Sequence, residues 1–189
     1  MREILPQAYL IGLIGLLAIA AFAVGRQVLR VRRDEASLAR LGGSGAASGS
    51  PRDSAGLYEL GSVQLRKRLY DQAGDSLRQA LRKAEEEQAP SEALALIQNA
   101  LGFALAAQER YPAAIRHYRA ALKARADYPV ALNNLAFALE KQQKGQEASA
   151  LYRQVLELEA GNATARRRLR LLERRSLNEG TGSDGDKAA

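Results

Sequence analysis

Apolar positions follow two different patterns along this chain. Residues 8–25 are eighteen consecutive residues without a charge. Residues 95–162 instead repeat their apolar positions with a period of 34. Between these regions, residues 42–53 are rich in Gly and Ser and carry few side chains that could pack. The pattern predicts a transmembrane helix, a flexible linker and an all-α repeat domain.

The repeat is defined by a small set of packing positions. In one copy they hold Leu101, Gly102, Leu105, Ala114, Tyr118 and Ala121, and in the next copy Leu135, Ala136, Leu139, Ala148, Tyr152 and Val155. Small residues at two of these positions let two antiparallel helices approach closely, and the larger residues fill the gaps between them. This pattern resembles the tetratricopeptide repeat, whose helix pairs stack so that each pair is buried against the next. The resemblance implies a right-handed α-solenoid.

A third, earlier copy fits when the interval is seven residues longer. Its packing positions hold Leu60, Gly61, Tyr70, Ala73, Leu77, Ala80 and Leu81. The extra residues are Gln88 to Leu94, about two helical turns, which can lengthen helices without turning their faces. Gln64 stands where the repeat usually has a large apolar residue, which predicts looser packing. We expect repeats at about 54–87, 95–128 and 129–162, a capping helix at 163–177 and a disordered tail at 178–189.

The apolar run at residues 8–25 is long enough to span a bilayer, at about 27 Å as a helix. It could be a cleavable signal peptide, since Ala21-Phe22-Ala23 has the small-x-small pattern, or an uncleaved anchor. Positive charge is concentrated after the run, where Arg26, Arg30, Arg32, Arg33 and Arg40 outnumber Asp34 and Glu35. Positive flanks are retained in the cytoplasm. We therefore expect residues 1–41 to be a single-pass anchor with a basic juxtamembrane segment, and the repeats to be cytoplasmic or stromal.

Composition removes most kinds of chemistry. The 189 residues carry a formal charge of +7, one His and no Cys. Without Cys there is no disulfide, thiolate metal site or Cys nucleophile. His117 falls at an outward position of a predicted helix, where we expect a solvated side chain. The sequence contains no Walker glycine loop, serine elbow or metal-ligand spacing. We expect no enzymatic activity, catalytic residue, cofactor, metal or small-molecule substrate.

Binding of other proteins remains as the function. The resemblance to tetratricopeptide repeats implies a concave groove lined by the first helix of each pair. Carried over by position, its residues are Tyr58, Arg66, Asn99, Phe103, Asn133, Asn134, Phe137 and Lys141. An Asn can bond a peptide backbone as donor and acceptor, and a Phe one turn away provides an apolar anchor. The alternative is that Phe103 and Phe137 pack between helices.

The predicted capping helix is strongly basic. Its arginines include Arg166, Arg167, Arg170 and Arg174, and Glu173 is the one acidic residue among residues 163–177. Such a patch can bind anionic lipid headgroups, an acidic protein surface or RNA, or it can simply be solvated. No aromatic residue for base stacking lies near it, so we expect no nucleic-acid partner.

Several segments together resemble one family. They are the N-terminal anchor, the sequence RQVLRVRRDEASLARL after it, the wider first interval, and the motifs NALGFA, ALNNLAFA and NATARRR. They resemble thylakoid-membrane tetratricopeptide-repeat proteins of cyanobacteria and plastids that assist photosystem I assembly. The resemblance implies a scaffold that binds photosystem I subunits or other assembly factors, holds no cofactor and has its repeats on the cytoplasmic or stromal face. Two alternatives stay open: a membrane-tethered adaptor in envelope biogenesis or secretion, and a regulatory subunit that localises an enzyme to the membrane.

Overall fold

The chain consists of two units, Met1–Ser50 and Pro51–Ala189, and the computed structural model describes residues 16–24, 26 and 53–183. In the first unit, residues 16–24 are helical and present exposed apolar side chains, among them Leu16, Ile19 and Phe22. Within the described ranges, no helix combines the length and the apolar character needed to cross a membrane. The remaining parts of the predicted span, 8–15 and 25, lie outside those ranges, as do residues 27–41 and the linker residues 42–52.

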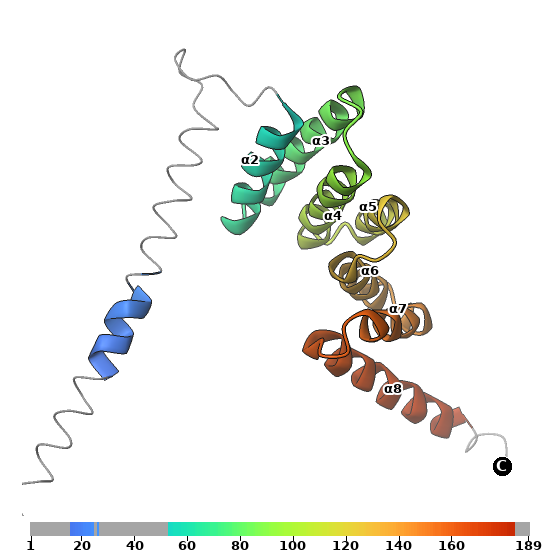
Figure 1. Cartoon of the computed structure of the whole chain (residues 1–189). Helices are drawn as coiled ribbons and strands as arrows, with labels where there is room; N and C mark the ends of the chain where they lie inside the picture. Colours follow the sequence, from blue (N-terminus) through green and yellow to red (C-terminus); the bar gives the residue numbers. More distant parts are fainter. Residues whose placement is uncertain (1–15, 25, 27–52, 184–189) are drawn as a thin grey trace, which may run out of the picture. The chain divides into compact units, whose positions relative to one another are not determined.

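The second unit is a series of helices, each packed on the next (Figure 1). The helices are α2 (Ser54–Arg66), α3 (Tyr70–Glu86), α4 (Ser91–Ala107), α5 (Tyr111–Ala124), α6 (Pro129–Lys141), α7 (Gly145–Leu158) and α8 (Ala163–Ser183). Helices α2 and α3, α4 and α5, and α6 and α7 form three hairpins. Helix α2 also contacts α4, and α4 contacts α6, so these three helices line one side of the array. The described residues contain no strand, and the predicted all-α repeat fold is confirmed.

The same turn ends the first helix of every hairpin. Arg68, Glu109 and Gln143 each have a positive φ, between 60° and 61°. In each turn the next residue donates its backbone N–H to the carbonyl five positions earlier, as Arg110 does to Leu105 at 2.9 Å. This is the Schellman arrangement, which satisfies carbonyls left free at a helix end. The same local backbone conformation therefore forms the turn in all three hairpins.

Steric fit between small and large residues holds each hairpin together. A Cβ added to Gly102 on α4 would lie 2.6 Å from a ring carbon of Tyr118 on α5, and one added to Gly61 on α2 would lie 2.6 Å from Leu77 on α3. The packing residues predicted for the second and third copies are all buried. In the first copy, Leu60, Tyr70 and Leu81 are only half-buried. Close backbone approach is thus the physical basis of the repeat.

The seven extra residues of the first interval are divided between two helices. Helix α3 has 17 residues where α5 and α7 have 14, and α4 has 17 where α6 has 13. The longer α3 ends beside the start of α2. There the Glu87 carboxylate accepts hydrogen bonds from the Ser54 hydroxyl and from the Ser54 backbone N–H, the latter at 3.3 Å. Although Glu87 is exposed, it therefore joins the end of α3 to the first turn of α2.

Helix α8 closes the array and is longer than the sequence indicated. Asn162 caps its start, because its Oδ1 accepts from the Ala165 backbone N–H at 3.0 Å. The helix continues to Ser183, so the predicted end of the cap at Leu177 and the predicted disorder of residues 178–183 are wrong. No Pro interrupts this stretch, and Gly180 and Gly182 cost only about 1 kcal/mol each in a helix. Residues 184–189 of the predicted tail lie outside the described part of the chain.

Candidate functional site

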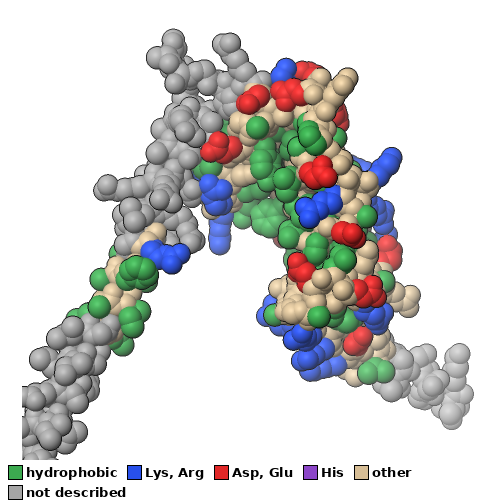
Figure 2. Space-filling model, viewed as in Figure 1, with side chains coloured by type: hydrophobic (Ala, Val, Ile, Leu, Met, Phe, Trp, Pro, Cys, Tyr) green, Lys and Arg blue, Asp and Glu red, His purple; other side chains and the backbone are tan. Residues whose placement is uncertain are grey.

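The side of the array lined by α2, α4 and α6 carries exposed apolar side chains. Phe103 is 44% exposed on α4, and Leu96, two turns earlier on the same helix, and Val130 on α6 are also exposed. Figure 2 shows hydrophobic side chains gathered over this part of the domain. Exposed apolar residues grouped on one face are typical of protein-binding sites. The phenylalanines were predicted either to face the groove or to pack between helices. Phe103 faces solvent in this structure.

A polar chain crosses the same face between neighbouring repeats. Asn134 donates from Nδ2 to Asn99 Oδ1 at 3.0 Å, and Asn99 Nδ2 donates to the Tyr128 hydroxyl at 3.4 Å. Burial raises the pKa of Tyr128, and nearby Tyr58 adds to this rise, so the hydroxyl stays neutral at physiological pH. The two asparagines therefore satisfy part of each other's hydrogen-bonding capacity. Among the described residues, no further hydrogen-bond partner is seen for the second N–H of the Asn99 amide or for Asn134 Oδ1.

Asn133 occupies the repeat position that matches Asn99, but its surroundings differ. Its Oδ1 is buried and has no hydrogen-bond partner among the described residues. The residue that pairs with Asn99 is instead the next one along the chain, Asn134. Sequence periodicity alone could not distinguish these two adjacent asparagines.

Phe137 contacts two cations at the α8 end of the same face. The Lys141 ammonium is 5.5 Å from the ring centroid, and the Arg168 guanidinium is 5.0 Å from it. Arg168 also pairs with Glu140 at 3.1 Å. Both cations are within cation–π range, so the partly buried Phe137 ring helps to fix α8 on α6. This role of Arg168 could not be predicted from the repeat, because Arg168 follows Glu140 by 28 residues and not by the repeat period.

The other predicted residues are spread along the domain. Tyr58 on α2 is half-buried and packs against the apolar core. Arg66 is exposed in the last turn of α2, where its guanidinium donates to the Ser62 carbonyl at 3.4 Å. On α8, all four arginines of the predicted basic patch border one open hollow of about 230 Å³; these are Arg166, Arg167, Arg170 and Arg174.

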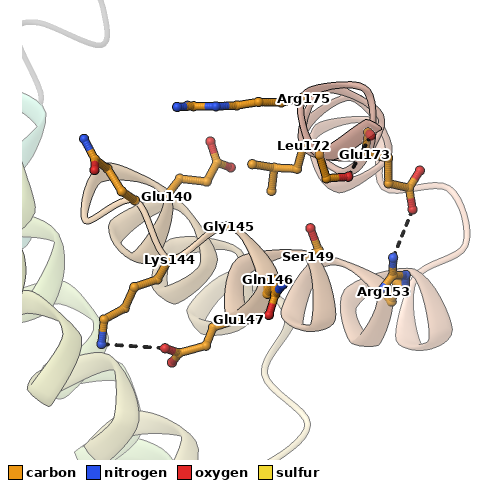
Figure 3. Close-up of a pocket in the computed structure, with 12 residues that line it drawn as sticks. Glu140, Lys144, Gly145, Gln146, Glu147, Ser149, Arg153, Leu172, Glu173 and Arg175 are labelled. Atoms are coloured by element: carbon orange, nitrogen blue, oxygen red, sulfur yellow. Dashed lines mark hydrogen bonds and ion pairs between the residues drawn. The ribbon is translucent and has the colours of Figure 1, made fainter. Parts of the chain in front are cut away.

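A larger hollow of about 620 Å³ lies between the α6–α7 turn, α7 and α8 (Figure 3). Figure 3 shows side chains of both signs around it, including the Lys144–Glu147 pair at 3.6 Å and the Arg153–Glu173 pair at 3.1 Å. Each of these carboxylates is neutralised by a nearby cation. Within the described residues, no group of three or more His, Cys, Asp or Glu side chains could hold a metal ion. This arrangement favours a structural role for these ion pairs over a catalytic one.

His117 differs from its expected environment. It is half-buried, and its Nδ1 lies 2.7 Å from Gln98 Oε1 on α4. An amide oxygen can only accept, so Nδ1 carries the proton. Burial lowers the pKa of His117, and the charges of Arg116 and Arg78 lower it further. The solvated histidine predicted from helical position is wrong, because Gln98 from the neighbouring helix reaches over it.

Comparison with known proteins agrees with the repeat geometry. A family profile described as TPR repeat matches residues 102–143. A chloroplastic tetratricopeptide repeat domain-containing protein of Arabidopsis thaliana, PYG7, is 34% identical over 92% of this chain and 56% of its own length. The uncharacterized protein ycf37 of Cyanophora paradoxa is 36% identical over 60% of this chain and 64% of its own length. The ycf37 protein of Guillardia theta is 34% identical over 67% of this chain and 70% of its own length. The chain thus spans less than two thirds of the first two relatives.

Solved structures share this fold at low sequence identity. The first TPR of Spaghetti (RPAP3), bound to an HSP90 peptide, has a TM-score of 0.61 and 21% identity over 67% of this chain and 94% of that one. The Sgt2 TPR domain from Aspergillus fumigatus has a TM-score of 0.61 and 20% identity over 70% of this chain and 85% of that one. At such identities the likeness shows the fold alone. Tetratricopeptide repeats are in general protein-interaction scaffolds, and these matches indicate no catalytic family.

Proposed function

This chain belongs to the tetratricopeptide-repeat photosystem I assembly family that includes PYG7 and ycf37, and from that premise we propose that it is a membrane-anchored scaffold that assists photosystem I assembly. It binds photosystem I subunits or other assembly factors through the face lined by α2, α4 and α6. The observation that carries the proposal is the exposed apolar face around Phe103, in a chain whose relatives include a chloroplastic protein. An assembly factor needs such a reversible contact surface and no catalytic group.

The binding chemistry follows from the exposed side chains. An extended segment of the client would place an apolar side chain against Phe103, which is rigid and large enough to act as an anchor. The free N–H of Asn99 and the free carbonyl of Asn134 can pair with the segment's backbone. The first TPR of RPAP3, which shares this fold, is bound to a peptide. Direct anchoring by one aromatic and two amide groups favours a weak, exchangeable complex, as transient assembly requires.

The membrane anchor is a separate part of the proposal. Residues 8–25 carry no charge and are followed by an excess of arginines, which favours a single span with the repeats on the cytoplasmic or stromal side of a thylakoid membrane. Protease added to sealed vesicles with that side outward should digest the repeats. Protection of the repeats in those vesicles would contradict the orientation, and release of the protein by alkaline carbonate would contradict the span.

The binding face can be tested with a matched pair of variants. Phe103→Ala removes an exposed ring from the face, whereas Leu158→Ala removes a side chain of similar exposure, 42%, from α7. Both residues are exposed, so both variants should fold. Tagged wild-type and variant proteins are purified from gently solubilised membranes, and the co-purifying proteins are identified by mass spectrometry.

Three outcomes separate the possibilities. Photosystem I subunits or their assembly factors should co-purify with the wild type and with Leu158→Ala, and should be depleted with Phe103→Ala. Recovery of envelope or secretion components in their place would support the adaptor alternative, and recovery of one enzyme in fixed ratio would support the regulatory subunit. Unchanged partners in Phe103→Ala would place the binding site elsewhere.

A further inference from the structure

One face of α8 has a composition unlike the rest of the domain. Arg167, Arg170 and Arg174 lie on this face and form no ion pair within the described residues, while Arg166 donates to the Ala160 carbonyl. These four arginines surround one hollow together with Leu171, which is 54% exposed. We call this surface, formed by Arg166, Arg167, Arg170, Leu171 and Arg174, the basic face of α8. No carboxylate lines its hollow.

The opposite face of α8 packs against the rest of the domain. Ala165 is buried, and Leu169 and Leu172 pack against the apolar core. Glu173, the one acidic residue near the arginines, is turned to the other hollow, where it pairs with Arg153 on α7 (Figure 3). Among the described side chains, no carboxylate therefore pairs with the arginines of the basic face. Such a concentration of charge around an exposed leucine suits a partner of opposite charge that also accepts apolar groups.

We propose that the basic face of α8 docks on the surface of an anionic membrane. The arginines would pair with lipid headgroups, and Leu171 would enter the boundary between headgroups and acyl chains, as in helices that lie in the membrane interface. Long Arg side chains can reach headgroups while their stems cover apolar surface. Leu177, one turn beyond Arg174, is also exposed and extends the apolar component. This docking is additional to the proposed span at residues 8–25 and to the client-binding face.

Other occupants fit this surface less well. A second copy of the chain would bring the same arginines face to face, so a symmetric dimer through this surface is opposed by like-charge repulsion. RNA is usually held by aromatic stacking as well as charge, and residues 163–183 contain no aromatic residue. An acidic protein would satisfy the arginines but would leave Leu171 without a specific partner. An anionic bilayer provides both negative groups for the arginines and an apolar interior for Leu171.

The expected anchor makes such docking effective. An anchored chain, as proposed, keeps its repeat domain covalently attached to the bilayer. Under these conditions weak contacts suffice, because the local concentration of the surface is on the order of millimolar. Each arginine near an anionic surface changes the docked-to-undocked ratio about fivefold. Docking would hold the last repeat at the membrane and leave the face around Phe103 open to clients.

The absence of Cys gives a direct experiment on the full-length chain. A single cysteine introduced as Leu171→Cys is labelled with the polarity-sensitive fluorophore NBD, and a second protein carries the label at Gln79→Cys, an exposed site on α3. Each is placed in nanodiscs of pure phosphatidylcholine or of phosphatidylcholine with phosphatidylglycerol. We expect a blue shift and increased intensity at position 171 only in the anionic discs, and no change at position 79.

Two charge variants of equal net charge provide the control. The triple variant Arg167→Gln/Arg170→Gln/Arg174→Gln removes three charges from the basic face, and Arg82→Gln/Arg116→Gln/Lys123→Gln removes three from α3 and α5. The first should lower the docked-to-undocked ratio roughly 100-fold, at about fivefold per charge, and the second should leave it nearly unchanged. The shift should also weaken at high salt.

Several results would overturn the proposal. These are no shift in anionic discs, an equal shift in neutral discs, or an equal loss in both charge variants. A shift produced by polyglutamate in neutral discs, with none in anionic discs, would assign the face to an acidic protein instead. Failure of the protein to co-elute with any disc would reject the anchor, which belongs to the proposed function. In that case flotation of the full-length chain with vesicles of the two compositions still tests the basic face.

Discussion

Gln64 is the residue at which a single substitution should stabilise this protein most clearly. It is 8% exposed on α2, and its Oε1 has no hydrogen-bond partner among the described residues. The next two repeats have Leu105 and Leu139 at the same position, and these are 3% and 1% exposed. A polar oxygen is therefore held in a site that the fold otherwise fills with an aliphatic side chain.

The size of the effect follows from two contributions. A buried oxygen without a partner costs about 1–3 kcal/mol, because its bonds to water are not replaced. Leucine occupies a volume similar to that of glutamine, so Gln64→Leu should fit with little strain and bury slightly more apolar area. We expect the free energy of unfolding to rise by about 2 kcal/mol. For a domain of this size, the midpoint of thermal unfolding should increase by roughly 5 °C.

The assay is thermal unfolding of the full-length chain in detergent, followed by circular dichroism, with hydrogen exchange to locate the change. Repeats contact mainly their neighbours, so protection should increase in α2 and α3 and little in α6 and α7. Gln64→Ala removes the same oxygen but leaves a void, and it should give no comparable gain. An unchanged or lowered midpoint in Gln64→Leu would refute the reasoning, since it would mean that the amide is satisfied or that the site cannot hold a leucine.

Three further predictions concern stability. Glu87→Ala should cost about 1 kcal/mol and increase hydrogen exchange at the start of α2, because Ser54 loses its acceptor; protection that stays the same would show that the contact contributes nothing. Gly102→Ala should cost about 1–2 kcal/mol in urea unfolding, because its Cβ would lie 2.6 Å from the Tyr118 ring and the strain outweighs the gain in helix propensity; a stabilised variant would contradict this packing. The pKa of His117 is lower in the folded chain than in the unfolded chain, so the unfolded state binds the proton more readily and the free energy of unfolding should fall as the pH is lowered through about 6.5. His117→Gln should reduce this loss of stability between about pH 8 and about pH 5.5. An unchanged pH dependence would exclude the histidine as its source.

The helix pairs could be predicted from sequence because their code is local and steric. Gly102 recurs as Ala136 one repeat later, and Tyr118 recurs as Tyr152, so the small and large partners of each hairpin are visible in the spacing alone. The insertion was also interpretable, because seven residues are about two helical turns and preserve the buried faces. The structure distributes these residues over α3 and α4, and Gly61, Ala73, Leu77 and Ala80 of the first copy stay buried.

The candidate site was less predictable, because its contacts join different repeats. Asn99 bonds Asn134, 35 residues away, and Arg168 reaches the ring of Phe137 from the capping helix. Neither contact follows from helical periodicity. The periodicity predicts which side of a helix faces the groove, but it does not predict which of two adjacent residues, such as Asn133 and Asn134, bonds to the next repeat. The end of α8 was missed for a related reason: no following repeat packs there to set a boundary, so weak propensities alone decide where the helix stops.

The geometry also determines which substitution reports on binding. Asn133 has a buried oxygen, and the Phe137 ring contacts Lys141 and Arg168. Substituting either residue therefore disturbs the packing of α6 and α8 as well as the surface. A loss of partners in such variants would have two causes that cannot be separated. Phe103 is exposed and makes no such cross-helix contact in the described structure, so its removal changes the surface with little effect on the fold. Phe103 is therefore the groove residue whose substitution most directly measures recognition of a client.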